Sequence, residues 1–92
     1  MGLPMYRVSD TVRSTHGQDG AIVLDIRQGQ MFNLNFVGSR ILELLKEGSA
    51  QAEIVDEIVR EFGVSRDRAE NDVRQFLETL QNNHLVESMD QT

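Results

Sequence analysis

Residues 20–38, GAIVLDIRQGQMFNLNFVG, change their hydrophobic rhythm twice within one short stretch. Apolar residues alternate along 21–26 and again along 30–35, and such alternation is typical of strands with one buried face. After Asn35 the apolar residues follow the longer spacing of a helix, beginning with Val37. The stretch therefore predicts a β-hairpin whose second strand leads directly into a helix.

The loop of this hairpin decides which side chains are buried. A two-residue loop at Gln28-Gly29 would divide the apolar residues between both faces. A three-residue loop, Arg27-Gln28-Gly29, puts glycine where the backbone must be left-handed, and we expect this loop. It places Phe32 opposite Leu24 and Leu34 opposite Ile22. The expected buried face then comprises Ile22, Leu24, Ile26, Phe32 and Leu34, with Met31 and Asn33 on the other face.

Three helices are expected after the hairpin, each with apolar residues at helical spacing and a recognisable start or stop residue. Ser49 and Ser65 are the expected N-caps, and Gly63 suits the left-handed position just after a helix. The helices are expected at residues 37–46, 50–62 and 66–82.

The remaining segments complete the predicted architecture. Residues 6–8 and 12–15 are expected to form one short, irregular first strand, and 84–86 to return along the core before the chain frays over 87–92. This order predicts an α+β fold that is winged-helix-like, with a three-stranded antiparallel sheet followed by three helices. We expect one domain over residues 1–92, with its core at about 6–87.

Composition indicates the cellular compartment in which the protein is expected. The 92 residues carry a formal net charge of −6 and include no cysteine, which excludes disulfides and thiolate chemistry. No apolar run approaches the roughly 20 residues that cross a bilayer, and we expect no signal peptide. These features predict a cytoplasmic protein without membrane contact.

The charge distribution disfavours binding to nucleic acid. Residues 43–92 contain twelve acidic and five basic residues, and the helix at 66–82 contains four acidic residues and three arginines. That helix has the position of a DNA-recognition helix, in which Asn71 and Gln75 are able to read adenine edges. Because phosphate contacts supply most of the affinity for nucleic acid, a small DNA-binding winged helix is the weaker alternative.

Motifs for catalysis or cofactor binding are missing from the sequence. It has neither a phosphate-binding loop nor a glycine-rich dinucleotide fingerprint. The two histidines, His16 and His84, fall in different predicted elements, without cysteines or carboxylates at metal-ligand spacing. We therefore expect a non-enzyme without catalytic residues, metal or cofactor.

The strand at 30–35 is an edge strand in a three-stranded meander, so one side of its backbone lacks a partner within the sheet. It contains no Lys, Arg, Asp, Glu or Pro, the residues that usually protect such an edge. An extended peptide that added a strand there would gain affinity from backbone hydrogen bonds. The alternatives are coverage by the N-terminus or by a second copy, as in a homodimer formed by edge pairing or hairpin swapping, or a dimerising interaction adaptor.

Several segments occur in a fixed order along the chain: the apolar strand with Asp25, the glycine turn, Phe32-Asn33-Leu34-Asn35, Gly38 before an Ile-Leu pair, Ala52-Glu53-Ile54-Val55, and Leu85-Val86. Taken in this order, they resemble the PqqD-like family over about residues 6–87. The resemblance implies a peptide-binding chaperone, a recognition element of ribosomally made, post-translationally modified peptide (RiPP) pathways in natural product biosynthesis. It implies binding of a precursor's leader peptide as an added strand on the third strand, beside the third helix, and presentation to a modifying enzyme such as a radical S-adenosylmethionine protein, a protease or a cyclase.

The expected peptide-binding residues come from the edge strand and from one flank of the last helix. If Ala69, Val73, Phe76 and Leu80 point inward, two exposed flanks remain, and the sequence does not decide which of them faces the strand. One flank comprises Glu70, Arg74 and Gln81. We prefer the other, with Leu77 as an added apolar contact. The expected site is Gln30, Met31, Phe32, Asn33, Leu34, Asn35, Arg68, Asp72, Gln75, Leu77 and Thr79.

Overall fold

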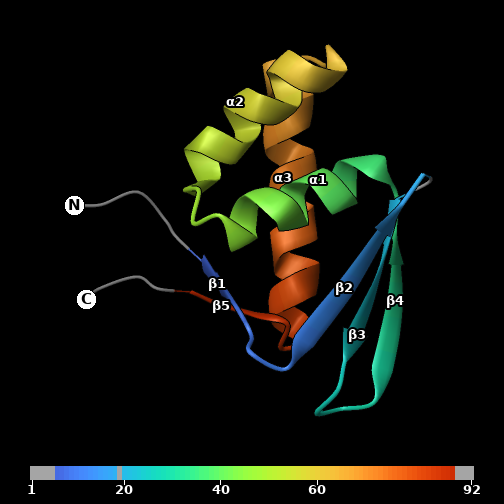
Figure 1. Cartoon of the computed structure of the whole chain (residues 1–92). Helices are drawn as coiled ribbons and strands as arrows, with labels where there is room; N and C mark the ends of the chain where they lie inside the picture. The colour runs from blue at the N-terminus through green and yellow to red at the C-terminus, as the bar shows by residue number, and fades with distance from the viewer. Residues whose placement is uncertain (1–5, 19, 89–92) are drawn as a thin grey trace.

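The computed structural model of the chain describes residues 6–18 and 20–88. Five strands and three helices occupy these residues, and the helices follow the main sheet (Figure 1). The expected α+β, winged-helix-like fold is confirmed. The elements are β1 Tyr6–Val8, β2 Val12–Gly17, β3 Gly20–Asp25, β4 Gln30–Leu34, α1 Phe36–Lys46, α2 Gln51–Phe62, α3 Arg66–Asn82 and β5 Val86–Ser88.

The strands form two antiparallel sheets, of order β2-β3-β4 and β1-β5. The expectation of one irregular first strand is wrong, because β1 leaves the main sheet and pairs with β5 near the two chain ends (Figure 1). A turn closed by the Val12 N–H donating to the Ser9 carbonyl (3.1 Å) separates β1 from β2. Leu85 and Val86 do return to the core, but residues 87–88 belong to β5, and 89–92 lie outside the described residues.

The β3–β4 hairpin has a different register from the expected one. Its loop has four residues, 26–29, and Phe32 lies opposite Val23 while Leu34 lies opposite Ala21. Gly29 has the expected left-handed backbone, with φ of 69°. Phe32 and Leu34 face inward as expected, whereas the expected burial of three further residues is wrong: Ile22, Leu24 and Ile26 are exposed.

Asp25 gives the physical reason for this register, because it takes an inward position that the pattern assigns to solvent. Only 1% exposed, its carboxylate accepts from the Thr11 hydroxyl (3.1 Å), the Arg27 N–H (3.0 Å) and the Gln28 amide (2.6 Å). Burial raises the pKa of Asp25, but the hydrogen bonds from Gln28, Thr11 and the loop backbone outweigh it, so the pKa lies below its ordinary value. Because Asp25 points inward, the alternate residues of β3, Ile22 and Leu24, point outward.

The helices begin and end close to the expected residues. Asn35 caps α1 by accepting from the Gly38 N–H (2.8 Å), and Ser65 caps α3 by accepting from Arg68 (3.2 Å). The α2 N-cap is Ala50 rather than the expected Ser49, because the Glu53 carboxylate supplies the acceptor for the Ala50 N–H (2.8 Å). Gly63 ends α2 in the left-handed conformation, with φ of 67°.

The hydrophobic core lies between the helices and the inner face of the main sheet, where α1 packs on β3. In Figure 1, α3 runs the length of the molecule behind α1, and the main sheet stands to one side. Residues of β4 and α3 line one cavity together, among them Phe32 and Leu34 of β4 and Phe76 and Leu80 of α3. The core residues are Val12, Val23, Ile41, Leu42, Leu44, Leu45, Ile54, Val55, Ile58, Ala69, Val73, Leu77, Leu80, Leu85 and Val86.

Candidate functional site

The open edge of β4 is the first component of the candidate site. Within the described residues β4 pairs only with β3. The Asp25 carbonyl accepts from the Gly29 N–H (2.8 Å) on the β4 side, and the next residue, Ile26, donates to the Thr11 carbonyl (3.0 Å) on the β2 side. Because successive residues of a strand direct their backbone groups to opposite sides, odd-numbered residues of β3 face β4.

This alternation identifies the unpaired groups of β4. Ile22 and Leu24 direct their backbone groups toward β2, and their partners in β4 are Asn33 and Met31. The N–H and C=O groups of Met31 and Asn33 therefore point to the open edge. These two residues offer the hydrogen bonds that an added strand needs, whereas Phe32 and Leu34 use theirs on β3.

A groove between β4 and α3 is the second component. It consists of two adjoining cavities that share Asn35, Phe76 and Thr79. The first, of about 330 Å³, lies over Phe32 and Leu34 and is mostly apolar; the second, of about 480 Å³, extends to the start of α1 and is more polar. We call the two together the groove.

The preferred flank of α3, Arg68, Asp72, Gln75 and Thr79, lines the second cavity, beside the start of α1. Of these four residues, Thr79 also lines the cavity beside β4. Of the expected strand residues, Phe32, Asn33, Leu34 and Asn35 line the groove, while Gln30 and Met31 lie on β4 outside it. Asn35 also has a structural role, because its side chain is the N-cap of α1.

The expected roles of Leu77 and Phe76 are reversed, since Phe76 was expected to point into the core and Leu77 to contact the peptide. Leu77 is only 1% exposed and belongs to the core, so it has no surface with which to contact a bound peptide. Phe76 is half-buried and lines both cavities. The sequence signal that could have revealed this is Gly38 in the first turn of α1, where a Cβ would lie 3.0 Å from Phe76 Cε1. A larger residue at this position would have to displace the Phe76 ring by a few tenths of an ångström.

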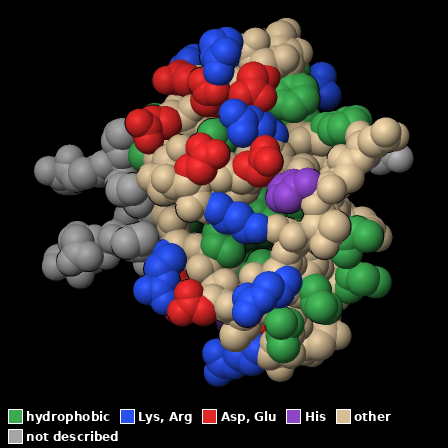
Figure 2. Space-filling view, viewed as in Figure 1, with side chains coloured by type: hydrophobic (Ala, Val, Ile, Leu, Met, Phe, Trp, Pro, Cys, Tyr) green, Lys and Arg blue, Asp and Glu red, His purple; other side chains and the backbone are tan. Residues whose placement is uncertain are grey.

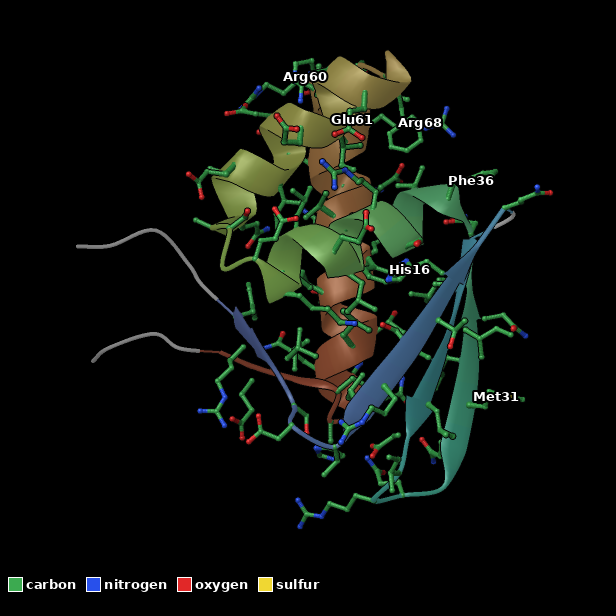
Figure 3. The ribbon with its side chains drawn as sticks, viewed as in Figure 1. His16, Met31, Phe36, Arg60, Glu61 and Arg68 are labelled. Atoms are coloured by element: carbon green, nitrogen blue, oxygen red, sulfur yellow. The ribbon has the colours of Figure 1, made fainter. Side chains whose placement is uncertain are left out.

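The arginine side chains of α3 contact other polar side chains. Arg68 lies at the α1 end of the groove (Figure 3), and its Nε is 3.7 Å from an Asp72 carboxylate oxygen. Arg66 pairs with Asp56 (2.6 Å), and the Arg74 guanidinium donates to the Asn71 side chain (2.6 Å). Each arginine of α3 thus already has a partner, which leaves this helix poorly suited to hold phosphate groups.

No group of three His, Cys, Asp or Glu side chains that could hold a metal occurs among the described residues. His16 Nδ1 lies 2.9 Å from the Ser39 hydroxyl, and His84 follows α3 with φ of 61°. A further polar cavity, of about 450 Å³, lies beside the β3–β4 loop, but its buried Asp25 carboxylate is fully engaged by the loop. Within residues 6–18 and 20–88, no helix is long and apolar enough to span a membrane.

Comparison with known proteins connects this geometry to one family. The profile of the family described as "Coenzyme PQQ synthesis protein D (PqqD)" matches residues 20–86. TbiB1, solved in complex with the TbiA(beta) leader peptide, is 44% identical; the match covers 88% of this chain and 94% of that chain, with a TM-score of 0.82. No curated protein matches significantly.

Two more distant structures support the fold. Lasso peptide synthetase B1, complexed with the leader peptide, is 24% identical over 89% of this chain and 96% of that chain, with a TM-score of 0.80. The PqqD truncation of Methylobacterium extorquens PqqCD, described as a functional and stand-alone RiPP recognition element, is 17% identical over 92% and 88% of the two chains, with a TM-score of 0.73.

Proposed function

The chain belongs to the PqqD family, and from that premise we propose that it is a non-catalytic RiPP recognition element that binds the leader of a precursor peptide. The observation that carries the proposal is the open backbone of β4 beside the groove. The 44% identity to TbiB1, a protein solved with a leader peptide, supports the same function.

Binding by strand addition follows from the chemistry of the two components. The backbone groups of Met31 and Asn33 would pair with the peptide, and these bonds give affinity for any extended chain. Selectivity would come from side chains of the peptide that enter the groove. Phe32, Leu34 and Phe76 offer an apolar surface to one of them, and the Arg68–Asp72 end offers polar contacts to another.

The partner of the bound peptide would be the enzyme that modifies it, such as a radical S-adenosylmethionine protein, a protease or a cyclase. The chain would bring the precursor to that enzyme by holding its leader. A homodimer formed by edge pairing or hairpin swapping would cover the same β4 backbone, so it would compete with the peptide. Light scattering on the eluting protein, with and without peptide, separates the two uses of the edge.

Fluorescence anisotropy with labelled peptides tests the proposed function. The probes are the TbiA(beta) leader peptide and the N-terminal segment of each short peptide encoded by an open reading frame that neighbours the gene for this chain. We expect saturable binding of at least one of these neighbouring peptides. If none of the probes binds to the folded chain, the proposal is wrong.

A proline substitution tests strand addition itself. Asn33→Pro removes one outward N–H of β4 without removing a bond to β3, and we expect at least a tenfold loss of peptide affinity. Ser14→Pro is the matched control, because Ser14 lies opposite Val23 and so directs its N–H to the other open edge, on β2. Circular dichroism checks that both variants fold. Equal affinity for Asn33→Pro, Ser14→Pro and the unchanged chain would exclude strand addition at β4.

A further inference from the structure

The two walls of the groove belong to different parts of the fold. Four residues of α3 are in the core, spaced along the helix: Ala69, Val73, Leu77 and Leu80. The other wall, β4, belongs to the main sheet, where β3 is its partner. A cavity of about 330 Å³ lies between these walls. The shape of the groove therefore depends on how the β3–β4 hairpin is attached to α3.

Opposite charges do not provide this attachment. Among the residues that the structure describes, no salt bridge joins the hairpin at 20–34 to a helix. Figure 2 shows acidic side chains gathered over the helices and hydrophobic side chains along the sheet. One end of β4 is attached covalently, because Asn35 follows it and caps α1. The end at the loop 26–29 depends on a separate contact.

Gln28 makes that contact. Its side-chain Nε2 donates to an Asp25 carboxylate oxygen (2.6 Å) and to the Asn83 carbonyl (3.1 Å), which uses both hydrogens of the amide. Within the described residues, no other hydrogen bond joins the hairpin to α3 or to its C-cap, Asn83. The Asn83 side chain donates in turn to the Thr79 carbonyl (2.8 Å), and both residues line the apolar cavity. Gln28 thus holds a residue of the groove wall.

The buried carboxylate of Asp25 orients the Gln28 side chain. Asp25 is only 1% exposed and also accepts from the Thr11 hydroxyl (3.1 Å) and the Arg27 N–H (3.0 Å). A hydrogen bond to an ionised acceptor is stronger than a neutral one, so the Gln28 amide is held in place although the residue is exposed. Since the amide is already oriented, its second bond, to Asn83, costs little further side-chain entropy.

We propose that Gln28 is a positioning residue for peptide binding, which fastens the loop end of the hairpin to the C-cap of α3 and keeps the groove in the shape that accepts a peptide. This inference rests on the proposed function. Gln28 lines neither cavity of the groove, so it acts through Asn83. Without the link the hairpin would adopt further orientations, and the apparent affinity would fall with the fraction of molecules that are competent to bind.

The test compares two variants that each remove one donor from the Asp25 carboxylate. Gln28→Met keeps the length of the side chain but has no N–H. Thr11→Val is the matched control, because the Thr11 hydroxyl contacts Ser9 and Asp25 and not α3. Circular dichroism and urea unfolding check that both variants fold.

Two measurements distinguish positioning from a merely structural role. Stopped-flow mixing with the labelled TbiA(beta) leader peptide, or with the neighbouring peptide that the unchanged chain binds, separates the association rate from the dissociation rate. NMR relaxation dispersion on the free proteins detects slow exchange between orientations of the hairpin at the amides of Phe32, Leu34, Thr79 and Asn83.

One net hydrogen bond biases an equilibrium by roughly fivefold, so we expect Gln28→Met to weaken peptide binding by up to about fivefold, through slower association, with new exchange at the groove amides. We expect Thr11→Val to change the affinity less than about twofold and to show no such exchange, although its urea midpoint falls.

Unchanged association by Gln28→Met, or equal losses in the two variants, would overturn the inference. A loss through faster dissociation alone, without new exchange, would also overturn it, because Gln28 would then contact the peptide itself. If the unchanged chain binds no peptide, the proposed function is wrong instead, and relaxation dispersion still decides whether Gln28 holds the hairpin to α3.

Discussion

Asp25 is a buried carboxylate that, among the residues the structure describes, is held by hydroxyl, amide and backbone donors and forms no salt bridge. Gln28 also donates to the Asn83 carbonyl (3.1 Å), so the same loop ties the hairpin to the end of α3. Hydrogen bonds to an ionised acceptor are stronger than neutral ones, which lets this charge stay buried. Asp25 therefore organises the loop of the hairpin, and Gln28 connects that loop to the end of α3.

The lowered pKa of Asp25 predicts a loss of stability in acid. The folded-state pKa lies below the ordinary value of 3.8, so the folded chain holds this proton less readily than the unfolded chain. The stabilisation is complete above pH 3.8 and is lost as the pH falls through the lower folded-state pKa. We expect the urea midpoint to fall as the pH is lowered below 3.8, with a weaker fall for Asp25→Asn.

Glu57 supplies the control for this measurement. Its pKa is also lowered, chiefly by its hydrogen bond with Arg60, but its carboxylate lies on the surface of α2. Screening by water and salt makes such pairs contribute little. Glu57→Gln is therefore expected to keep most of the acid dependence. If Asp25→Asn and the unchanged chain show the same midpoint at every pH, Asp25 does not act as we describe.

Gly20 is the glycine that the hairpin requires most. Its φ is 136°, and a Cβ there would lie 1.8 Å from the Leu34 carbonyl oxygen of the neighbouring β4. Gly20→Ala is expected to lower the free energy of unfolding by about 3 kcal/mol or more, since backbone strain and a clash add together. Gly17→Ala, with nothing within 4 Å of the added Cβ, is expected to change it by less than ~1 kcal/mol. Urea unfolding compares them, and equal values would contradict the predicted clash.

Individual residues of the hairpin also explain why the predicted buried face of its first strand is wrong. Alternation in 21–26 correctly predicts a strand, but alternation alone does not say which of its two faces is buried. The pattern favours Ile22 and Leu24 because they are the larger apolar residues. The hydrogen bonds of Asp25 reverse that choice, and hydrophobic periodicity does not reveal them.

At the scale of elements, helix boundaries were predictable because local chemistry fixes them. Ser65 and Gly63 act within one turn of their helix ends, as expected from their types. The facing of α3 toward β4 depends instead on long-range packing, so the sequence left both flanks open. The expected burial of Phe76 and exposure of Leu77 are wrong for the same reason: both residues lie at the border of the apolar stripe, and contacts between elements, such as that of Phe76 with Gly38 of α1, decide which is buried.

Phe76 links α3, α1 and β4 in the groove, so its ring is the expected apolar contact for a bound peptide. Removing a partly buried aromatic side chain at the centre of an interface commonly costs 2 kcal/mol or more, which is roughly thirtyfold in affinity. We expect Phe76→Ala to weaken leader binding about thirtyfold by anisotropy. Phe62→Ala, which removes another partly exposed ring from the surface, is expected to leave it unchanged. Equal affinities for the two variants would mean that the peptide does not use the apolar cavity.

At the scale of the whole molecule, the acidic side chains and the outward side chains of the main sheet lie on different sides. The helices carry most of the acidic residues, while the described outward side chains of the main sheet are apolar or polar, with one arginine, Arg13. The groove lies at the boundary, where Arg68 is paired with Asp72. Binding there depends on backbone hydrogen bonds and apolar contact more than on net charge.

This division predicts the salt dependence that distinguishes a peptide-binding domain from a DNA-binding winged helix. Salt weakens the long-range attraction between solvent-exposed charges, and few charged side chains in the groove lack a partner. We expect the affinity for the precursor leader to change less than about threefold between 50 and 500 mM NaCl, as roughly estimated from that screening. Duplex DNA bound through phosphate contacts would lose affinity by orders of magnitude over a similar range. Tight binding of random duplex DNA with a steep salt slope, together with no binding of the leader, would mean that the winged-helix architecture serves nucleic acid and that the open edge of β4 is incidental.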